Sequence, residues 1–277
     1  MTRACLISVG LLLSAAATAV GQLVHPRSAD YLFSSTVDDV RSLWLNPAGL
    51  AVVVETSIMA DFVFELPDGG STRLSQWTVG FNARGISVGY QRDRLVSDSA
   101  NHAVRLALSR GFPRGALGVS VTNYSSGTTD QGWDVGVRYA PLSPLQVALV
   151  LRHIGRPFVR GEVTPLTAVA GAHWTGGRGA VQLMAEALVS ERPGEGGYQT
   201  SYRGGARVTI GLAIPIAGLV ATDFGDNFSV TRWTFGLAVG GYRRGVVVAT
   251  LPDATASNDL LSVHGLATNR GHLLARR

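Results

Sequence analysis

The sequence predicts an all-β protein, a transmembrane antiparallel up-and-down β-barrel of about fourteen strands, on three observations. Apolar and polar residues alternate along nearly the whole chain after residue 51, as in strands with one apolar and one polar face. Only 16% of the residues are charged, below the about 25% usual for soluble domains. The connections between the alternating runs are long and short in turn, which is typical of membrane barrels.

Residues 1–21 resemble a secretory signal peptide. Arg3 supplies the positive start, Ala4 to Ala16 is apolar, and small residues around Ala19 offer a cleavage site. A membrane anchor is the alternative, but the apolar core is shorter than the ~20 residues that a spanning helix needs. Cys5, the only cysteine, precedes that core, so we expect neither disulfides nor cysteine metal sites after cleavage.

Residues 22–50 do not alternate. They mix proline, serine and aspartate with a predicted short helix around Val37 to Leu45. The segment ends in the sequence Asn46-Pro47-Ala48-Gly49-Leu50-Ala51, directly before the first predicted strand. Proline fixes its own φ and favours an extended residue before it, so this sequence predicts a turn.

The barrel is predicted to span residues 51–277. The runs near Leu212 to Val220 and Tyr242 to Val248 alternate least clearly, so twelve strands remain an alternative. The predicted strands are centred on 53–65, 74–82, 85–93, 102–110, 115–124, 132–140, 145–153, 166–174, 179–189, 201–211, 216–223, 229–239, 243–250 and 260–268.

The connections separate a membrane barrel from a soluble β-sandwich, the main alternative fold. A sandwich has no reason to sort its loops by length, whereas outer-membrane barrels have short periplasmic turns and longer external loops. When the connections are numbered from the N-terminus, the even-numbered ones, such as Ala83-Arg84, are short. The odd-numbered ones are long and polar, and they are 66–73, 94–101, 125–131, 154–165, 190–200, 224–228 and 251–259.

The alternation assigns one face of each strand to lipid and the other to a watery lumen. Aromatic residues near strand ends, such as Trp133, Tyr139 and Trp174, are predicted to form interfacial girdles. The outward set includes Phe62, Phe64, Trp77, Val79, Phe81, Ile86, Val88, Tyr90, Leu106, Leu108, Val135, Leu183, Trp233, Phe235 and Leu237. The predicted lumen-facing charges are Arg105, Asp134, Arg138, Arg152, Glu186, Arg203, Arg207 and Arg232.

The Asn46-Pro47-Ala48-Gly49 sequence, placed just before about fourteen strands, resembles the FadL-type superfamily of outer-membrane barrels, including its PorV/PorQ branch. The resemblance implies that residues 22–50 fold into the lumen as a plug. It also implies a channel in a Gram-negative outer membrane that passes small hydrophobic molecules passively, beside the plug or sideways through the wall. The alternative, from the PorV branch, is a non-transporting scaffold or shuttle for secreted proteins.

Asn46, Pro47 and the luminal arginines are the candidates for holding the plug, and no substrate residues are predicted. The expected partners are outer-membrane lipid, the barrel-assembly machinery, and a small hydrophobic ligand or secreted proteins. The net charge of +5 is not concentrated in one patch, so no nucleic acid is expected.

We expect no enzymatic activity, no cofactor and no metal site. The sequence holds no GxSxG or HExxH motif, so His153 and His173 are interpreted as loop-end or luminal residues. Asp223, Asp226 and Asn227 lack the spacing of a calcium loop and are interpreted as solvated loop residues.

Overall fold

The computed structural model describes residues 31–67, 70–94, 100–125, 129–159, 162–194, 196–211, 214–240, 244–252 and 258–269. The predicted signal peptide and residues 22–30 of the predicted plug lie outside these ranges. Within the described residues, no helix is both long and apolar enough to cross a membrane.

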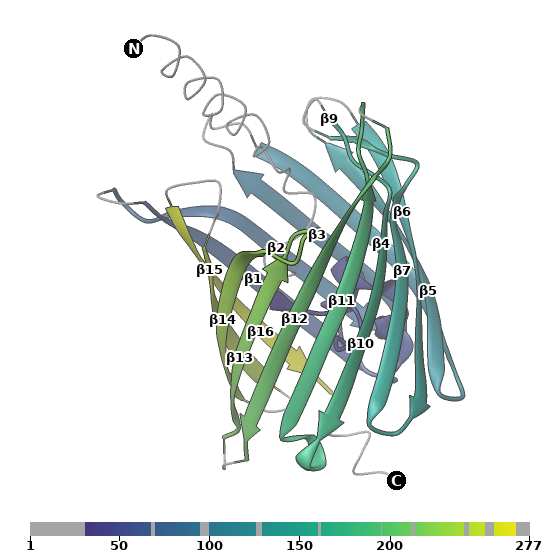
Figure 1. Cartoon of the computed structure of the whole chain (residues 1–277), viewed down its shortest axis with the longest axis vertical. Helices are drawn as coiled ribbons and strands as arrows, with labels where there is room; N and C mark the ends of the chain where they lie inside the picture. Colours follow the sequence, from purple (N-terminus) through teal and green to yellow (C-terminus); the bar gives the residue numbers. More distant parts are fainter. Residues whose placement is uncertain are drawn as a thin grey trace.

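The described strands form a closed antiparallel barrel of fourteen strands, in which sequence neighbours pair and β1 closes onto β16 (Figure 1). The fourteen-strand prediction is confirmed, and the two uncertain runs form β13 and β15. The barrel strands are β1 (Thr56–Pro67), β2 (Arg73–Ala83), β3 (Ile86–Arg94), β4 (Ala100–Phe112), β5 (Gly115–Ser125), β6 (Thr129–Leu142), β7 (Leu145–Ile154), β10 (Thr167–Gly176), β11 (Val181–Glu191), β12 (Tyr198–Ile210), β13 (Ile216–Phe224), β14 (Val230–Gly240), β15 (Arg244–Pro252) and β16 (Asn258–Thr268).

The short turns lie at one end of the barrel, called here the short-turn end, and the longer connections lie at the other, called the long-loop end (Figure 1). The turn from β2 to β3 has only Arg84 and Gly85 between the strands, both with positive φ, as a two-residue hairpin turn requires. The third odd connection is shorter than predicted, because β5 and β6 extend to Ser125 and Thr129. A short 3-10 helix, η3 (Gly177–Gly179), joins β10 to β11.

One long connection contains structure that the sequence pattern does not predict. Residues 154–165 are predicted to form a loop, but β8 (Phe158–Val159) and β9 (Glu162–Val163) pair there as a small hairpin. The hairpin stands at the long-loop end of the barrel (Figure 1).

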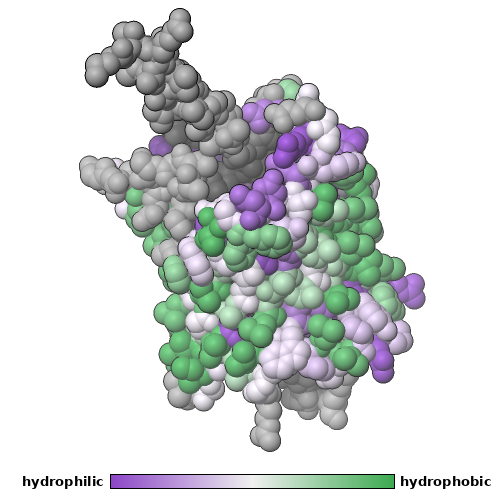
Figure 2. Space-filling view, in the orientation of Figure 1, coloured by the Kyte–Doolittle hydropathy of each residue, from purple (hydrophilic) through white to green (hydrophobic). Residues whose placement is uncertain are grey.

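The two faces of the wall follow the predicted alternation. Every residue of the outward set is exposed or partly exposed, with Ile86 and Leu108 among the most exposed at 65% and 59%. Trp133, Tyr139 and Trp174 also point outward. Apolar residues cover much of the wall in Figure 2, while hydrophilic residues gather around β9 at the long-loop rim. The inward face carries buried polar side chains that a lipid-facing wall would not tolerate.

Residues 31–51, called here the luminal segment, lie inside the barrel (Figure 1). The segment contains one helical turn, α2 (Ser42–Leu45), and the 3-10 helix η2 (Pro47–Ala51). The helix is shorter than predicted, because residues 37–39 have no helical structure and residues 40–41 form a turn. η2 contacts β4, β5 and β6, and α2 contacts β3 and β4, so the segment lies nearest the short-turn end of these strands.

Candidate functional site

The Asn46–Gly49 sequence builds the start of η2. Asn46 is extended, with φ −151° and ψ 103°, and its Oδ1 accepts a hydrogen bond of 3.1 Å from the Ala48 backbone N–H. Pro47 follows at the first helical position, where its missing N–H costs nothing. A Cβ on Gly49 would lie 2.3 Å from the Val37 carbonyl oxygen, so only glycine fits this turn.

The wall of the barrel is shaped to receive this segment through inward-facing glycines. A Cβ on Gly136 would lie 2.0 Å from Asn46 Oδ1, and one on Gly118 would lie 2.3 Å from the Pro47 carbonyl carbon. At contacts under 3.0 Å a neighbour has to shift before a Cβ fits, and this is hardest at Gly118, where the neighbour is the backbone of Pro47. The seat glycines, with the segment residues that they face, are Gly80 (Val40), Gly89 (Leu43), Gly118 (Pro47), Gly136 (Asn46), Gly171 (Ser34) and Gly205 (Phe33).

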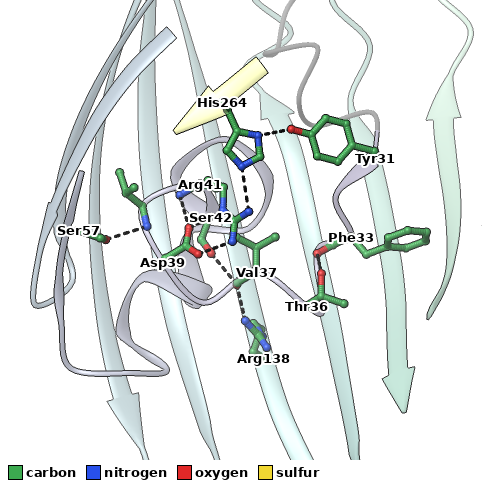
Figure 3. Close-up of polar contacts among 11 residues, drawn as sticks. Tyr31, Phe33, Thr36, Val37, Asp39, Arg41, Ser42, Ser57, Arg138 and His264 are labelled. Carbon is green, nitrogen blue, oxygen red and sulfur yellow. Dashed lines mark hydrogen bonds and ion pairs between the residues drawn. The ribbon is translucent and has the colours of Figure 1, made fainter. Parts of the chain in front are cut away.

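Four luminal arginines donate to backbone carbonyls of the segment. An irregular segment leaves carbonyl groups without helix or sheet partners, and a buried carbonyl without a partner is costly. The donor–acceptor distances are 2.9 Å from Arg105 to Leu43, 2.8 Å from Arg152 to Leu45 and 3.4 Å from Arg203 to Leu32. Arg138 donates to the Val37 carbonyl in the same way (Figure 3).

Carboxylates of the wall balance these arginines. Asp134 forms an ion pair of 2.9 Å with Arg105, and both side chains are 3% exposed. Glu186 accepts a hydrogen bond from the Ser34 backbone N–H and lies 4.0 Å from Arg203. The remaining charges pair along the wall, since Asp223 binds both Arg203 and Arg232 at 2.7 Å through its two oxygens.

The sequence interpretation of Asp223 is wrong. The sequence predicts a solvated loop residue there, but Asp223 lies on the inward face of β13, between two arginines from β12 and β14. The strand continues to Phe224, so the residue that resembles the start of a loop is part of the wall.

The predicted site residues thus fall into four groups. Asn46, Pro47, Ala48 and Gly49 are buried in the segment. Arg105, Arg138, Arg152, Arg203 and Glu186 hydrogen-bond to the segment, while Asp134 and Arg232 act on it through a neighbouring charge. Arg207 lies on β12 opposite Gln182 and Leu219. The seat glycines were not predicted, although their alternation on the polar face was a readable signal.

Apolar side chains fill the space between the segment and the wall. Val40, Leu43, Trp44 and Leu50 pack against Met59 and neighbouring wall residues. The Arg105 guanidinium also lies over the Trp44 ring, 5.2 Å from its centroid. A segment that is hydrogen-bonded and packed in this way is part of the barrel's core.

Two further residues of the segment meet a histidine of the wall. The Tyr31 hydroxyl hydrogen-bonds with His264 Nδ1, and Arg41 Nη1 lies 3.2 Å from His264 Nε2 (Figure 3). Burial alone would lower the pKa of the Arg41 guanidinium, but its ion pair with Asp39 more than offsets this and leaves the pKa above its ordinary value.

The β8–β9 hairpin leans onto the inner wall at the other end of the lumen. Val159 is buried against Ala103 and Tyr124. A Cβ on Gly132 would lie 2.9 Å from Pro157 Cγ, so one wall glycine also receives this loop. The signal that could have identified the hairpin is the pair Phe158-Val159 and Glu162-Val163 around an Arg-Gly dipeptide.

The histidines that were candidates for chemistry contact backbone groups. The His153 backbone N–H donates to Asp134, its ring bonds with the Pro165 carbonyl, and His173 lies against the backbone of Ser35. No group of three potential metal ligands occurs among the described residues.

An apolar groove of about 820 Å³ lies on the wall formed by β1–β3 and β14–β16. Outward-facing residues such as Ile58, Val79 and Phe81 line it. Two seat glycines, Gly80 and Gly89, line it as well. At these two positions, only backbone separates the groove from the luminal segment.

The strands form a closed fourteen-stranded barrel of the membrane type, and residues 31–51 lie in its lumen. No family model and no curated protein matches the sequence. The structure is similar to the monoaromatic hydrocarbon channel CymD, with a TM-score of 0.51 and 9% identity over 88% of this chain and 96% of that one. It is also similar to the toluene transporter TbuX of Ralstonia pickettii, with a TM-score of 0.55 and 10% identity over 84% and 94%. The chain therefore has the fold of an outer-membrane β-barrel.

Proposed function

We propose that this chain is an outer-membrane channel of the FadL type, which passes small hydrophobic molecules passively and is closed at rest by its luminal segment. The observation that carries the proposal is the seat of six glycines, a wall surface shaped for residues 31–51. Displacing a segment held in this way would open the lumen that it occupies.

Two features support a hydrophobic molecule as the substrate of the channel. The two similar structures are a hydrocarbon channel and a toluene transporter. The apolar groove offers a landing surface on the wall for a molecule that leaves the lumen sideways. Each of the fourteen barrel strands pairs with both neighbours, so such an exit requires local opening of the wall beside Gly80 and Gly89.

In this proposal the short-turn end faces the periplasm, the long loops face outward, and outer-membrane lipid covers the exposed apolar wall. The alternative of a PorV-like scaffold for secreted proteins has no observation in its favour among the described residues.

Uptake into vesicles tests the proposal. The protein and a variant lacking residues 22–51 are placed in vesicles with a lipopolysaccharide outer leaflet, and entry of a radiolabelled aromatic hydrocarbon is measured. We expect faster entry with the variant than with the full chain, and faster entry with either than with empty vesicles. Equal, negligible entry in all three removes the transport proposal.

A disulfide between segment and wall supplies a second variant that keeps all residues in place. Ser34 Oγ lies 2.8 Å from the position of a Cβ on Gly171, close to the spacing that a disulfide spans. In the variant Ser34→Cys/Gly171→Cys, oxidation is expected to abolish hydrocarbon entry and reduction to restore it. The single mutants, treated identically, are the controls.

A further inference from the structure

His264, on strand β16 of the wall, contacts two residues of the luminal segment, Tyr31 and Arg41. Its side chain is 1% exposed on the inward face of β16. The Tyr31 ring lies nearly parallel to the imidazole, with ring centroids 5.8 Å apart and an angle of 8° between the planes, and the Tyr31 hydroxyl bonds with His264 Nδ1. Arg41, ten residues further along the chain, reaches Nε2 from the other side (Figure 3).

These partners define the protonation state of the imidazole in the closed form. A guanidinium has only donors and does not lose its proton in proteins, so His264 Nε2 must accept from Arg41. The ring is therefore neutral, with its proton on Nδ1, and Nδ1–H donates to the Tyr31 hydroxyl oxygen.

A second proton on the ring is incompatible with this arrangement. It places an N–H of an imidazolium against an N–H of Arg41, with two like charges at the 3.2 Å of the present hydrogen bond. Arg41 is itself held by Asp39, at 2.9 Å from Nε and 2.6 Å from Nη2, so the whole turn around Arg41 has to move with it.

The wall offers the charged ring another partner. Asp61 of β1 is directly opposite His264 in the sheet register and accepts a hydrogen bond of 2.9 Å from Ser262. On the other side β15 presents Val247, which carries no charge. An imidazolium therefore gains by turning toward Asp61, away from Tyr31 and Arg41.

We propose that His264 is an acid-sensitive latch: protonation of its ring exchanges Tyr31 and Arg41 for Asp61, frees the luminal segment from β16 and opens the lumen. This inference rests on the proposed function, because it takes the segment to be the closure of the channel. An imidazole paired with Asp61 binds its proton at least as well as a free imidazole, which titrates at about pH 6.5, so the ratio of closed to open channels falls by up to about tenfold per pH unit below that value.

Conductance across planar bilayers between pH 7.5 and pH 4.5 tests the latch. The full chain is expected to be closed at pH 7.5 and to open on acidification. The variant His264→Gln keeps an acceptor for Arg41 and a donor for Tyr31 but does not titrate, so it is expected to stay closed throughout.

The chain provides a matched control in a second tyrosine–histidine pair. The Tyr90 hydroxyl bonds with His102 Nδ1 and joins two wall strands, and Tyr90 belongs to the outward set, on the opposite face of the wall from the segment. His102→Gln is therefore expected to open on acidification like the full chain. Acid opening that persists in His264→Gln overturns the latch, as does its loss in His102→Gln.

Two more variants separate the remaining outcomes. His173 also faces the segment, at Ser35, and an acid response that is lost only in His173→Gln assigns the switch to that residue and overturns the proposal. The chain lacking residues 22–51 is expected to conduct at every pH. If that variant conducts while the full chain stays closed at all pH values, the latch fails and the proposed channel stands; if the variant does not conduct, both fail.

Discussion

The luminal segment and the β8–β9 hairpin both lie against the inner wall, but the wall holds them differently. The segment has six seat glycines, donors from four arginines and a packed apolar face. The hairpin has one buried valine, one glycine contact and a hydrogen bond from the Phe158 backbone N–H to Asp130. The difference indicates that the wall holds the segment much more tightly than the hairpin, so the hairpin opens locally at a far lower free-energy cost.

Breaking the best-buried charge pair at the segment is expected to have the largest effect. Arg105→Met leaves Asp134 without its ion pair in a dry site and removes the donor to the Leu43 carbonyl. We expect the free energy of unfolding to fall by about 3–5 kcal/mol, as is typical when one partner of a buried pair is lost. Urea unfolding in lipid vesicles measures it.

The double variant Arg105→Met/Asp134→Leu is the control for that result. It removes the stranded carboxylate, so it is expected to recover much of the lost stability. A loss in Arg105→Met below about 1 kcal/mol would mean that water reaches Asp134 and that the segment does not seal this part of the lumen.

The next largest effect is expected from a glycine substitution in the seat, compared with one at an inward glycine outside the seat. Gly136→Ala drives a methyl group into Asn46, and we expect a cost of about 1–3 kcal/mol from overpacking. Gly236 is also inward, on β14, but a Cβ added there would lie 3.4 Å from its nearest neighbour, an atom of Leu219. Gly236→Ala is therefore expected to be neutral or stabilising by up to about 1 kcal/mol.

Limited trypsin digestion gives an independent measurement for this pair, because Arg41 is a cleavage site within the segment. Cleavage after Arg41 is expected to be faster in Gly136→Ala than in the parent chain and unchanged in Gly236→Ala. Equal rates in all three proteins would show that the seat glycines do not hold the segment.

The hairpin is expected to give the smallest effect on the barrel. Val159→Ala removes two methyl groups from the contact with Ala103 and Tyr124. Because the hairpin opens on its own, we expect the free energy of barrel unfolding to change by less than about 0.5 kcal/mol. Trypsin cleavage after Arg160, which lies between Val159 and Glu162 in the sequence, is expected to accelerate, and a stability loss like that of Arg105→Met would contradict the difference between the two regions.

The strands could be predicted because their physics is local. Alternation of side chains places apolar residues such as Leu108 and Phe235 outward wherever the strand continues. Residues at strand ends were less predictable, as Asp223 shows, because a charged residue near a glycine suits a loop and a luminal strand end equally well.

The seat could not be predicted in the same way. Whether Gly136 faces a backbone at close range or merely bends a strand depends on the path of a segment that begins about a hundred residues earlier. The partners of Arg138 and Arg152 are backbone carbonyls, which every residue carries, so no residue type in the sequence identifies them. The sequence Asn46-Pro47 predicts a turn, but the wall residues that face this turn are known only from the fold.

Single-channel conductance of the full chain and of the variant lacking residues 22–51 tests the central claim, that the luminal segment closes the barrel. Heat-modifiable gel migration first establishes that both proteins are folded barrels. At neutral pH the account predicts no current steps from the full chain and large, stable steps from the variant. Equal conductance of the two folded proteins would contradict it.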